Sequence, residues 1–554
     1  MTVVKKHPLE ITLILIIATL HIPVVFSHSN YLLTWFNTDD AFYYFKTAQH
    51  VVAGNGFTFD GIARTNGFHP LWMFAVIPFF APPGPYLPLR LLVGLLLLLN
   101  TGSALLLYRL ARRCLSPSAA FLTVLAFSLL PAIHGVTTRG GMESGINAFF
   151  IILLLHQLGN TDGKTLRGAL LLSGIAALTF LARLDNVFLA YLTGLGVLLK
   201  GWNPPRGGGD SPPWLWRLRL ALACFGPLTF VVLVYMGWNW IGFGTPTPVS
   251  GQVKRWWGTL PNTVYGFPPK RWVNFIGQFF TGAEGIGPWS IITGPFYASA
   301  ENLLTFLGLE ITIRLRRLAL AGLGLASAGV VGFLTRRNRK FVRAAVRGFG
   351  LIPLLFGCLF QITYYKAGGS VAERGWYWVG EMLFVVLAGG TLIESLYRTL
   401  PRKIAIRNRQ FPNYKLLITL PIAALLIIPH LSRIPRITNP PESSFYLRRA
   451  DWLEAHTEPG ARIAMTGSGS SGYFTNGRTL INLDGLINSY EYFQQMQNGT
   501  AHEYLASIGV DYVFGSPYIV QESDPYGVIF ENRLEQDAIF QDGDKALVLW
   551  RFVP

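Results

Sequence analysis

The stretch PLRLLVGLLLLLNTGSALLLYR, residues 88–109, has one arginine near each end and no other charged residue. An apolar run of about 20 residues is long enough to cross the hydrocarbon core of a bilayer as a helix. Ten more runs of this kind predict about eleven transmembrane helices. They lie near residues 9–28, 118–137, 144–159, 167–182, 186–201, 217–240, 318–335, 347–364, 376–396 and 415–432.

The composition agrees with this interpretation. The 554 residues are 51% hydrophobic and 14% charged, with a mean hydropathy of +0.38. Soluble domains are less apolar and carry more charge. We therefore expect an α-helical polytopic protein of the cell (inner or plasma) membrane, whose first partner is the lipid bilayer. The apolar run Pro70–Phe80 is too short to span and is expected to lie in the interface or to re-enter the membrane.

The net charge of +17 is unevenly distributed. From residue 433 onward there are nine Lys and Arg residues against fifteen Asp and Glu residues, so the basic excess belongs to the membrane part. Its arginines collect in alternate loops, which the positive-inside rule assigns to the cytoplasm. This distribution predicts a cytoplasmic N-terminus and an extracytoplasmic C-terminal region, and it removes the reason to expect a nucleic-acid partner.

The pattern changes near residue 433. Short alternating segments at 461–465, 479–483 and 512–514 are typical of strands, and 446–456 is amphipathic. We therefore expect two domains. Residues 1–432 form a transmembrane domain with a large first outer loop at 29–87, and residues 433–554 form a small extracytoplasmic α/β domain.

The first outer loop carries TDDAFYYFK, residues 38–46, with two adjacent carboxylates. Two like charges held close together raise the pKa of one of them, which suits a general base. We expect Asp39 or Asp40 to take a proton from a hydroxyl while the other carboxylate positions it or holds a cation. The alternative is that the pair only caps the aromatic helix that follows.

Other polar residues are predicted to lie on the same side of the membrane. Glu143 is the other acidic candidate for catalysis. Cations suited to a phosphate group are Lys254, Arg183, Arg374, Lys366 and His69, and the alternative for each is snorkelling to the interface. Expected substrate contacts are Tyr43, Tyr44, Asn66, Trp72 and Asp185; for the aromatic residues, a membrane-interface belt is the competing interpretation.

The segment GSGSSG, residues 467–472, follows a predicted strand and matches the dinucleotide fingerprint G-x-G-x-x-G. The residues after it are typical of a turn and not of the start of a helix. The domain is also expected to face a compartment without such cofactors. We therefore interpret the segment as a tightly turning loop near the membrane.

Together, the Asp-Asp-Ala loop, TNGFHPLW at 65–72, GMES at 141–144 and RLDN at 183–186 resemble bacterial members of the GT-C glycosyltransferase superfamily. The resemblance is patchy over residues 30–260 and most specific between Asp39 and Trp72. NLDGLIN at 482–488 resembles the outer domain of uncharacterised relatives.

This resemblance implies an enzyme that uses a polyprenyl-phosphate sugar as donor and a glycan, lipid or protein as acceptor. It implies inversion by a single displacement, with Asp39 or Asp40 as the base. Some relatives need a divalent cation, Mg or Mn, which Asp39 and Asp40 would hold here. Two alternatives are a transporter or flippase of lipid-linked glycan and a non-catalytic subunit of glycan assembly. Against a coupled transporter, no acidic residue falls at the middle of an expected span.

Overall fold

The computed structural model places a helix on every run predicted to cross the membrane. It describes residues 7–203, 212–270, 287–400, 414–431 and 444–554, with short pieces at 274, 404–406, 409–411 and 442. The expected domain boundary at 432 and 433 lies outside these residues. The helices on the expected spans are α2 (Pro8–Val25), α6 (Tyr86–Ala111), α7 (Pro117–Leu129) with α8 (Pro131–Thr137), α9 (Ser144–Asn160), α10 (Leu166–Ala182), α11 (Val187–Lys200), α12 (Pro213–Phe243), α16 (Ile313–Arg337), α18 (Leu351–Ala367), α19 (Val379–Thr399) and α20 (Tyr414–Leu431).

Five of the described helices are long and apolar enough to cross a membrane alone: α2, α6, α12, α16 and α19. Two bent pairs, α7 with α8 and α17 (Arg339–Gly348) with α18, raise this number to seven. Helices α9 and α10 are apolar but shorter, and they pack against α6 and α12 in the same bundle. The expected fold class, a polytopic helical membrane protein, is therefore confirmed, whereas the sidedness of its ends stays a prediction.

One helix of 17 residues lies outside the expected spans. Helix α15 (Ser290–Phe306) packs against α16, and Glu301 on α15 forms an ion pair with Arg316 on α16 at 3.2 Å. This helix could not be recognised in the sequence because Gly294, Pro295 and several polar residues interrupt its apolar pattern. A short hairpin of β1 (Ile404–Ile406) and β2 (Arg409–Phe411) lies farther along the chain.

The first outer loop is mostly helical. It contains α3 (Ser29–Trp35), α4 (Ala41–Val52), α5 (Pro70–Val76) and the 3-10 turn η1 (Ile77–Phe80). The run Pro70–Phe80 is therefore two short helical pieces, too short to span, as its length predicted. A further short helix, α13 (Val249–Trp257), follows α12, and two 3-10 turns, η2 (Leu184–Asn186) and η4 (Gly375–Tyr377), lie between helices of the bundle.

The C-terminal region is an α/β domain, as predicted. Its five-stranded sheet has the order β4-β3-β5-β7-β6, in which β3, β4 and β5 are parallel and the β6–β7 hairpin is antiparallel. The strands are β3 (Arg462–Met465), β4 (Thr479–Asn482), β5 (Tyr512–Gly515), β6 (Leu534–Asp542) and β7 (Lys545–Phe552); the helices are α21 (Phe445–His456), α22 (Gly469–Phe474), α23 (Tyr490–Asn498), α24 (Ala501–Ser507), η6 (Tyr518–Glu522) and α25 (Tyr526–Ile529). Helix α22 corrects one expectation, because residues 469–474 form a short helix and not a turn.

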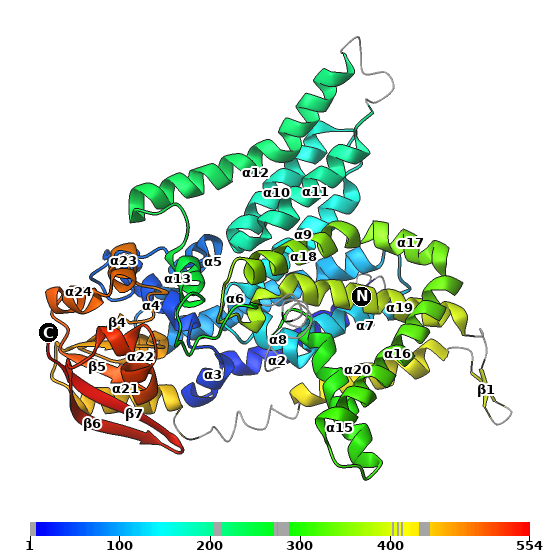
Figure 1. Cartoon of the computed structure of the whole chain (residues 1–554). Helices are drawn as coiled ribbons and strands as arrows, with labels where there is room; N and C mark the ends of the chain where they lie inside the picture. Colours follow the sequence, from blue (N-terminus) through cyan, green and yellow to red (C-terminus); the bar gives the residue numbers. More distant parts are fainter. Residues whose placement is uncertain are drawn as a thin grey trace.

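The first outer loop and the C-terminal domain share one hydrophobic core. Phe42 on α4 packs against Tyr446, Tyr473 and Phe474, with ring centroids 5.5 to 5.8 Å apart. Burying one such ring stabilises a fold by about 1.5–3 kcal/mol. Figure 1 shows α4 (blue) beside α22, β4 and α23 (orange to red), at the end of the helical bundle. The C-terminal domain is therefore docked on the loop that carries Asp39 and Asp40.

Candidate functional site

Asp39 and Asp40 directly precede α4, yet neither caps it with its side chain. The residue at the cap position, Asp40, makes no side-chain hydrogen bond to the helix amides. The carboxylate of Asp39 accepts its hydrogen bonds from another domain. The interpretation of the pair as a plain helix cap is therefore wrong.

Both oxygens of the Asp39 carboxylate are bound by the C-terminal domain. Its Oδ2 accepts the backbone N–H of Gly469 at 3.0 Å, and its Oδ1 accepts the backbone N–H of Ser470 at 3.0 Å and the Ser470 hydroxyl at 2.5 Å. Arg449 lies 3.4 Å from the same oxygen. Asp39 therefore has little capacity left for a substrate or a metal ion.

The carboxylate of Asp40 lies on the wall of a cavity of about 360 Å³. No described residue donates a hydrogen bond to it. Burial raises the pKa of Asp40 to about 6; the opposite charge of Lys254 counteracts this shift, and the like charges of Asp39 and Asp484 strengthen it. A carboxylate with this pKa is largely ionised at neutral pH and basic enough to accept a proton.

Glu143, Arg183 and Asp185 form a buried ionic network at the side of the cavity. Arg183 binds both oxygens of Asp185, at 3.1 and 2.8 Å, and also contacts Glu143. Burial favours the neutral acid, but the Arg183 guanidinium holds the pKa of Asp185 below its usual range. Tyr365 donates a further hydrogen bond to Asp185 at 2.8 Å. Arg183 therefore neutralises two carboxylates and is not a spare cation for a phosphate.

His69 connects this network to the open cavity. Its Nδ1 accepts the backbone N–H of Leu184 at 3.4 Å, so Nε2 carries the proton of the neutral ring and faces Glu143 at 3.7 Å. Burial lowers the pKa of His69, although Glu143 opposes the shift. Tyr44 completes this wall by donating to Glu143 at 3.1 Å.

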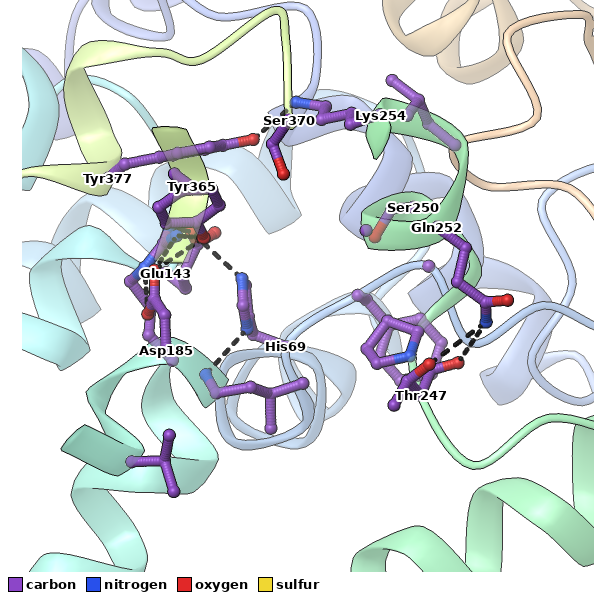
Figure 2. A pocket seen from close by; sticks show the side chains of 18 of the residues that line it. His69, Glu143, Asp185, Thr247, Ser250, Gln252, Lys254, Tyr365, Ser370 and Tyr377 are labelled. Carbon is purple, nitrogen blue, oxygen red and sulfur yellow. Dashed lines mark hydrogen bonds and ion pairs between the residues drawn. The ribbon is translucent and has the colours of Figure 1, made fainter. Parts of the chain in front are cut away.

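Figure 2 shows the two walls of the cavity. His69, Glu143, Asp185, Tyr365 and Tyr377 lie on one side, Thr247, Ser250 and Gln252 on the other, and Lys254 and Ser370 at the top of the view. Thr247, Ser250 and Gln252 come from α13 and the segment before it.

The predicted cations separate into different environments. Lys254 lines the cavity and donates to the Tyr377 hydroxyl and, at 3.3 Å, to the carbonyl of Ala372. Lys366 is paired with Glu373 and does not line the cavity. Arg374 is exposed outside the lining, although its charge acts on Asp40. Of the predicted cations, the structure therefore brings Lys254, Arg183 and His69 to the cavity.

The predicted substrate contacts also separate. Tyr43, Tyr44 and Asp185 line the cavity. Asn66 is buried outside it, where it donates to Asn239 at 2.8 Å and accepts the Val249 N–H at 3.0 Å, which ties α12 to α13. Trp72 is fully buried and donates to the Gly141 carbonyl at 3.1 Å. Asn66 and Trp72 thus hold the shape of the outer loops.

Two residues of the cavity region escaped the sequence analysis. Asp484 accepts hydrogen bonds from Tyr265 at 2.8 Å and from the Gly467 N–H at 2.7 Å, and Tyr43 lies 3.5 Å from it. Arg255, next to Lys254, lines the cavity and stacks over Tyr364 with 4.4 Å between Cζ and the ring centroid. Asp484 could have been found because it belongs to the NLDGLIN stretch. The sequence around Arg255 does not distinguish it from an arginine at the membrane interface.

A tightly held divalent cation does not fit these side chains. The carboxylate of Asp39 accepts hydrogen bonds from N–H and O–H donors, so Asp40 is the one carboxylate of the pair that could bind a metal ion. Among the described residues no group of three His, Cys, Asp or Glu side chains is arranged to hold a metal ion. We therefore derive no step of the chemistry through a metal.

The helical bundle gives the cavity an apolar part of its lining. Phe180 from α10, Val187 and Phe188 from α11 and Val232 and Met236 from α12 line it. The cavity therefore combines charged and apolar lining, which suits an amphiphilic ligand.

The C-terminal domain and the whole chain have separate counterparts among known proteins. A domain of unknown function (DUF8728) matches residues 440–549. No curated protein matches the chain by sequence.

Solved structures resemble the whole chain. The apo oligosaccharyltransferase of Archaeoglobus fulgidus gives a TM-score of 0.50 at 14% identity, over 96% of this chain and 72% of that chain. Its complex with Zn and sulfate gives 0.51 at 10% identity, over 98% and 73%. ArnT from Cupriavidus metallidurans bound to undecaprenyl phosphate gives 0.47 at 12% identity, over 99% and 98%. At these identities the two oligosaccharyltransferase matches show the fold alone: the chain has the same overall fold as this oligosaccharyltransferase.

Proposed function

We propose that the protein is a glycosyltransferase that moves a sugar from a polyprenyl-phosphate donor to an acceptor hydroxyl at the extracytoplasmic face of the membrane. The observation that carries this proposal is the position of Asp40. Asp40 lines the cavity and accepts no side-chain hydrogen bond from a described residue, whereas both carboxylate oxygens of its neighbour Asp39 are bound by the C-terminal domain.

Asp40 is the general base in this proposal. It takes the proton of the acceptor hydroxyl as that oxygen attacks the anomeric carbon of the sugar. The new glycosidic bond forms on one face while the bond to the phosphate oxygen breaks on the other, so the configuration inverts. The proton ends on Asp40 and the electron pair on the leaving polyprenyl phosphate.

The cavity supports both halves of an amphiphilic donor. Lys254, together with Arg255 and Ser370, can stabilise the charge that develops on the leaving phosphate. The apolar wall built by α10, α11 and α12 suits the first units of a prenyl chain. In this proposal Glu143 is not the base. Its contact with Arg183 gives it a structural role in the wall of the cavity.

A panel of donors tests this function. The purified protein in nanodiscs is incubated with radiolabelled polyprenyl-phosphate pentoses and hexoses, and release of free polyprenyl phosphate is measured. We expect release from one donor class with the protein and none without it. If no donor is consumed at any pH or with any divalent ion, while the protein moves lipid-linked glycan between leaflets, a flippase is the better description.

A further inference from the structure

The C-terminal domain reaches directly into the loop that carries the proposed base. Two of its segments bracket the start of α4: Gly469 and Ser470 bind the side chain of Asp39, and Asp484 lies 3.5 Å from the hydroxyl of Tyr43. Asp40 stands between these two fixed residues and faces the cavity.

We propose that the C-terminal domain is a latch that positions Asp40, with Asp39 as the positioning residue that the domain grips. The latch consists of Asp39, Arg449, Gly469 and Ser470. The proposal rests on the proposed function, because it takes Asp40 as the base, and it gives the domain of unknown function a role inside the active site.

The Gly-rich segment is shaped for this contact. A Cβ added at Gly469 would lie 2.2 Å from the backbone carbonyl oxygen of Asp39. The two backbone segments therefore approach each other so closely that only a glycine fits at this position. The segment has the form of an anion-binding loop after a strand, but the anion it holds is a carboxylate of the same chain.

The groups that bind Asp39 are buried, while the Asp39 side chain itself is 23% exposed. Arg449 is 7% exposed and Ser470 is fully buried, and the Arg449 guanidinium donates to the Ser470 hydroxyl at 2.9 Å. Hydrogen bonds to a charged group in such surroundings contribute more than neutral ones, and breaking one leaves its partner unsatisfied. Losing the latch therefore frees the loop before α4 and with it the position of Asp40.

A matched pair of serines tests the latch. The hydroxyl of Ser470 binds Asp39, whereas that of its buried neighbour Ser471 finds no hydrogen-bond partner among the described residues. We expect Ser470→Ala to lower kcat about tenfold with little change in the KM for the donor, and Ser471→Ala to leave both unchanged. Equal activity of the two variants overturns the proposal, and it does so even if the variants at Asp39 fail to fold.

A double-mutant cycle adds a second test. If Asp39→Asn and Ser470→Ala remove the same contact, the double variant is no slower than the slower single variant. Multiplication of the two losses overturns the proposal. The acidic limb of the kcat profile should also move to lower pH in Asp39→Asn, which removes a charge acting on Asp40, and stay in place in Ser470→Ala.

Hydrogen exchange separates the latch from the proposed chemistry. We expect the amides of Gly469 and Ser470 to exchange at least tenfold faster in Asp39→Asn than in Asp40→Asn or the unaltered protein. Unchanged exchange overturns the latch. If Asp40→Asn transfers sugar normally, the proposed function fails, while the exchange result still decides whether the domain grips Asp39.

Discussion

Asp39 and Asp40 are adjacent in the chain but belong to different environments. The carboxylate of Asp39 accepts three hydrogen bonds of 2.5 to 3.0 Å from Gly469 and Ser470, whereas that of Asp40 lines the cavity and accepts none from a described residue. The two carboxylates therefore have separate roles, because the C-terminal domain holds Asp39 and leaves Asp40 available to a substrate.

The pH dependence of transfer should report the pKa of Asp40. Burial raises this pKa to about 6, and a base works only when ionised. We therefore expect kcat/KM to fall about tenfold per pH unit below pH 6 and to level off above it. Initial rates of polyprenyl-phosphate release between pH 4.5 and 8 give this profile. A limb near pH 4, the ordinary range of an aspartate, would assign the base to another group.

Arg183 should matter chiefly for stability. Arg183→Met leaves Glu143 and Asp185 buried without their common partner, and such a change costs about 3–5 kcal/mol. Thermal unfolding in nanodiscs should therefore occur at a much lower temperature. The exposed Arg374→Met variant is the control and should unfold like the unaltered protein. Equal unfolding temperatures would show that the network around Arg183 contributes little.

Lys254 and Lys366 make a contrasting pair for donor binding. Lys254→Met removes a cation from the cavity, so we expect the KM for the donor to rise about tenfold or more. Lys366→Met leaves Glu373 without its partner and should lower the unfolding temperature while the KM stays unchanged. Titrating the donor in both variants distinguishes them. A KM that responds to Lys366 and not to Lys254 would move the phosphate site elsewhere.

Two glutamates of α19 should respond oppositely to the same substitution. Glu381 is fully buried, and neither of its oxygens has a hydrogen-bond partner in the part of the chain that the structure describes. Glu394 accepts hydrogen bonds from the Ser116 N–H and from Arg398, both at 3.0 Å. Glu381→Met should stabilise the protein by about 1–3 kcal/mol and Glu394→Met should destabilise it. Thermal unfolding of both variants checks this, and destabilisation by Glu381→Met would point to a partner for that carboxyl.

The membrane helices could be predicted from the sequence because long apolar runs are rare outside transmembrane helices. Helix α15 was missed, because its apolar pattern is interrupted by Gly294 and Pro295. The strands of the C-terminal domain were also predictable, since alternating apolar segments recur there. The short helix α22 was not, because its first four residues are glycine and serine, and tertiary contacts with Phe59 and Asp39 decide its conformation.

Within the site, spacing alone pointed to the Asp39–Asp40 pair but could not divide its roles. Gly469 and Ser470, which bind Asp39, lie 430 and 431 positions later in the chain. A contact over this distance cannot be predicted from the residues around Asp39. Glu143 and Lys366 show the same limit. Each carries the right charge on the predicted side, but tertiary folding pairs Glu143 with Arg183 and Lys366 with Glu373.

The transfer rate of Asp40→Asn, measured beside its stability, decides whether Asp40 is the base. The folded pKa of Asp40 lies above its ordinary value of 3.8, so the ionised carboxylate weakens the native state as the pH rises through about 6. The amide variant should therefore be at least as stable as the unaltered protein at pH 7.5. We predict that it loses transfer by a factor of about 10² to 10⁴ while it still binds the donor. A stable Asp40→Asn protein that transfers sugar at the unaltered rate would contradict this role for Asp40.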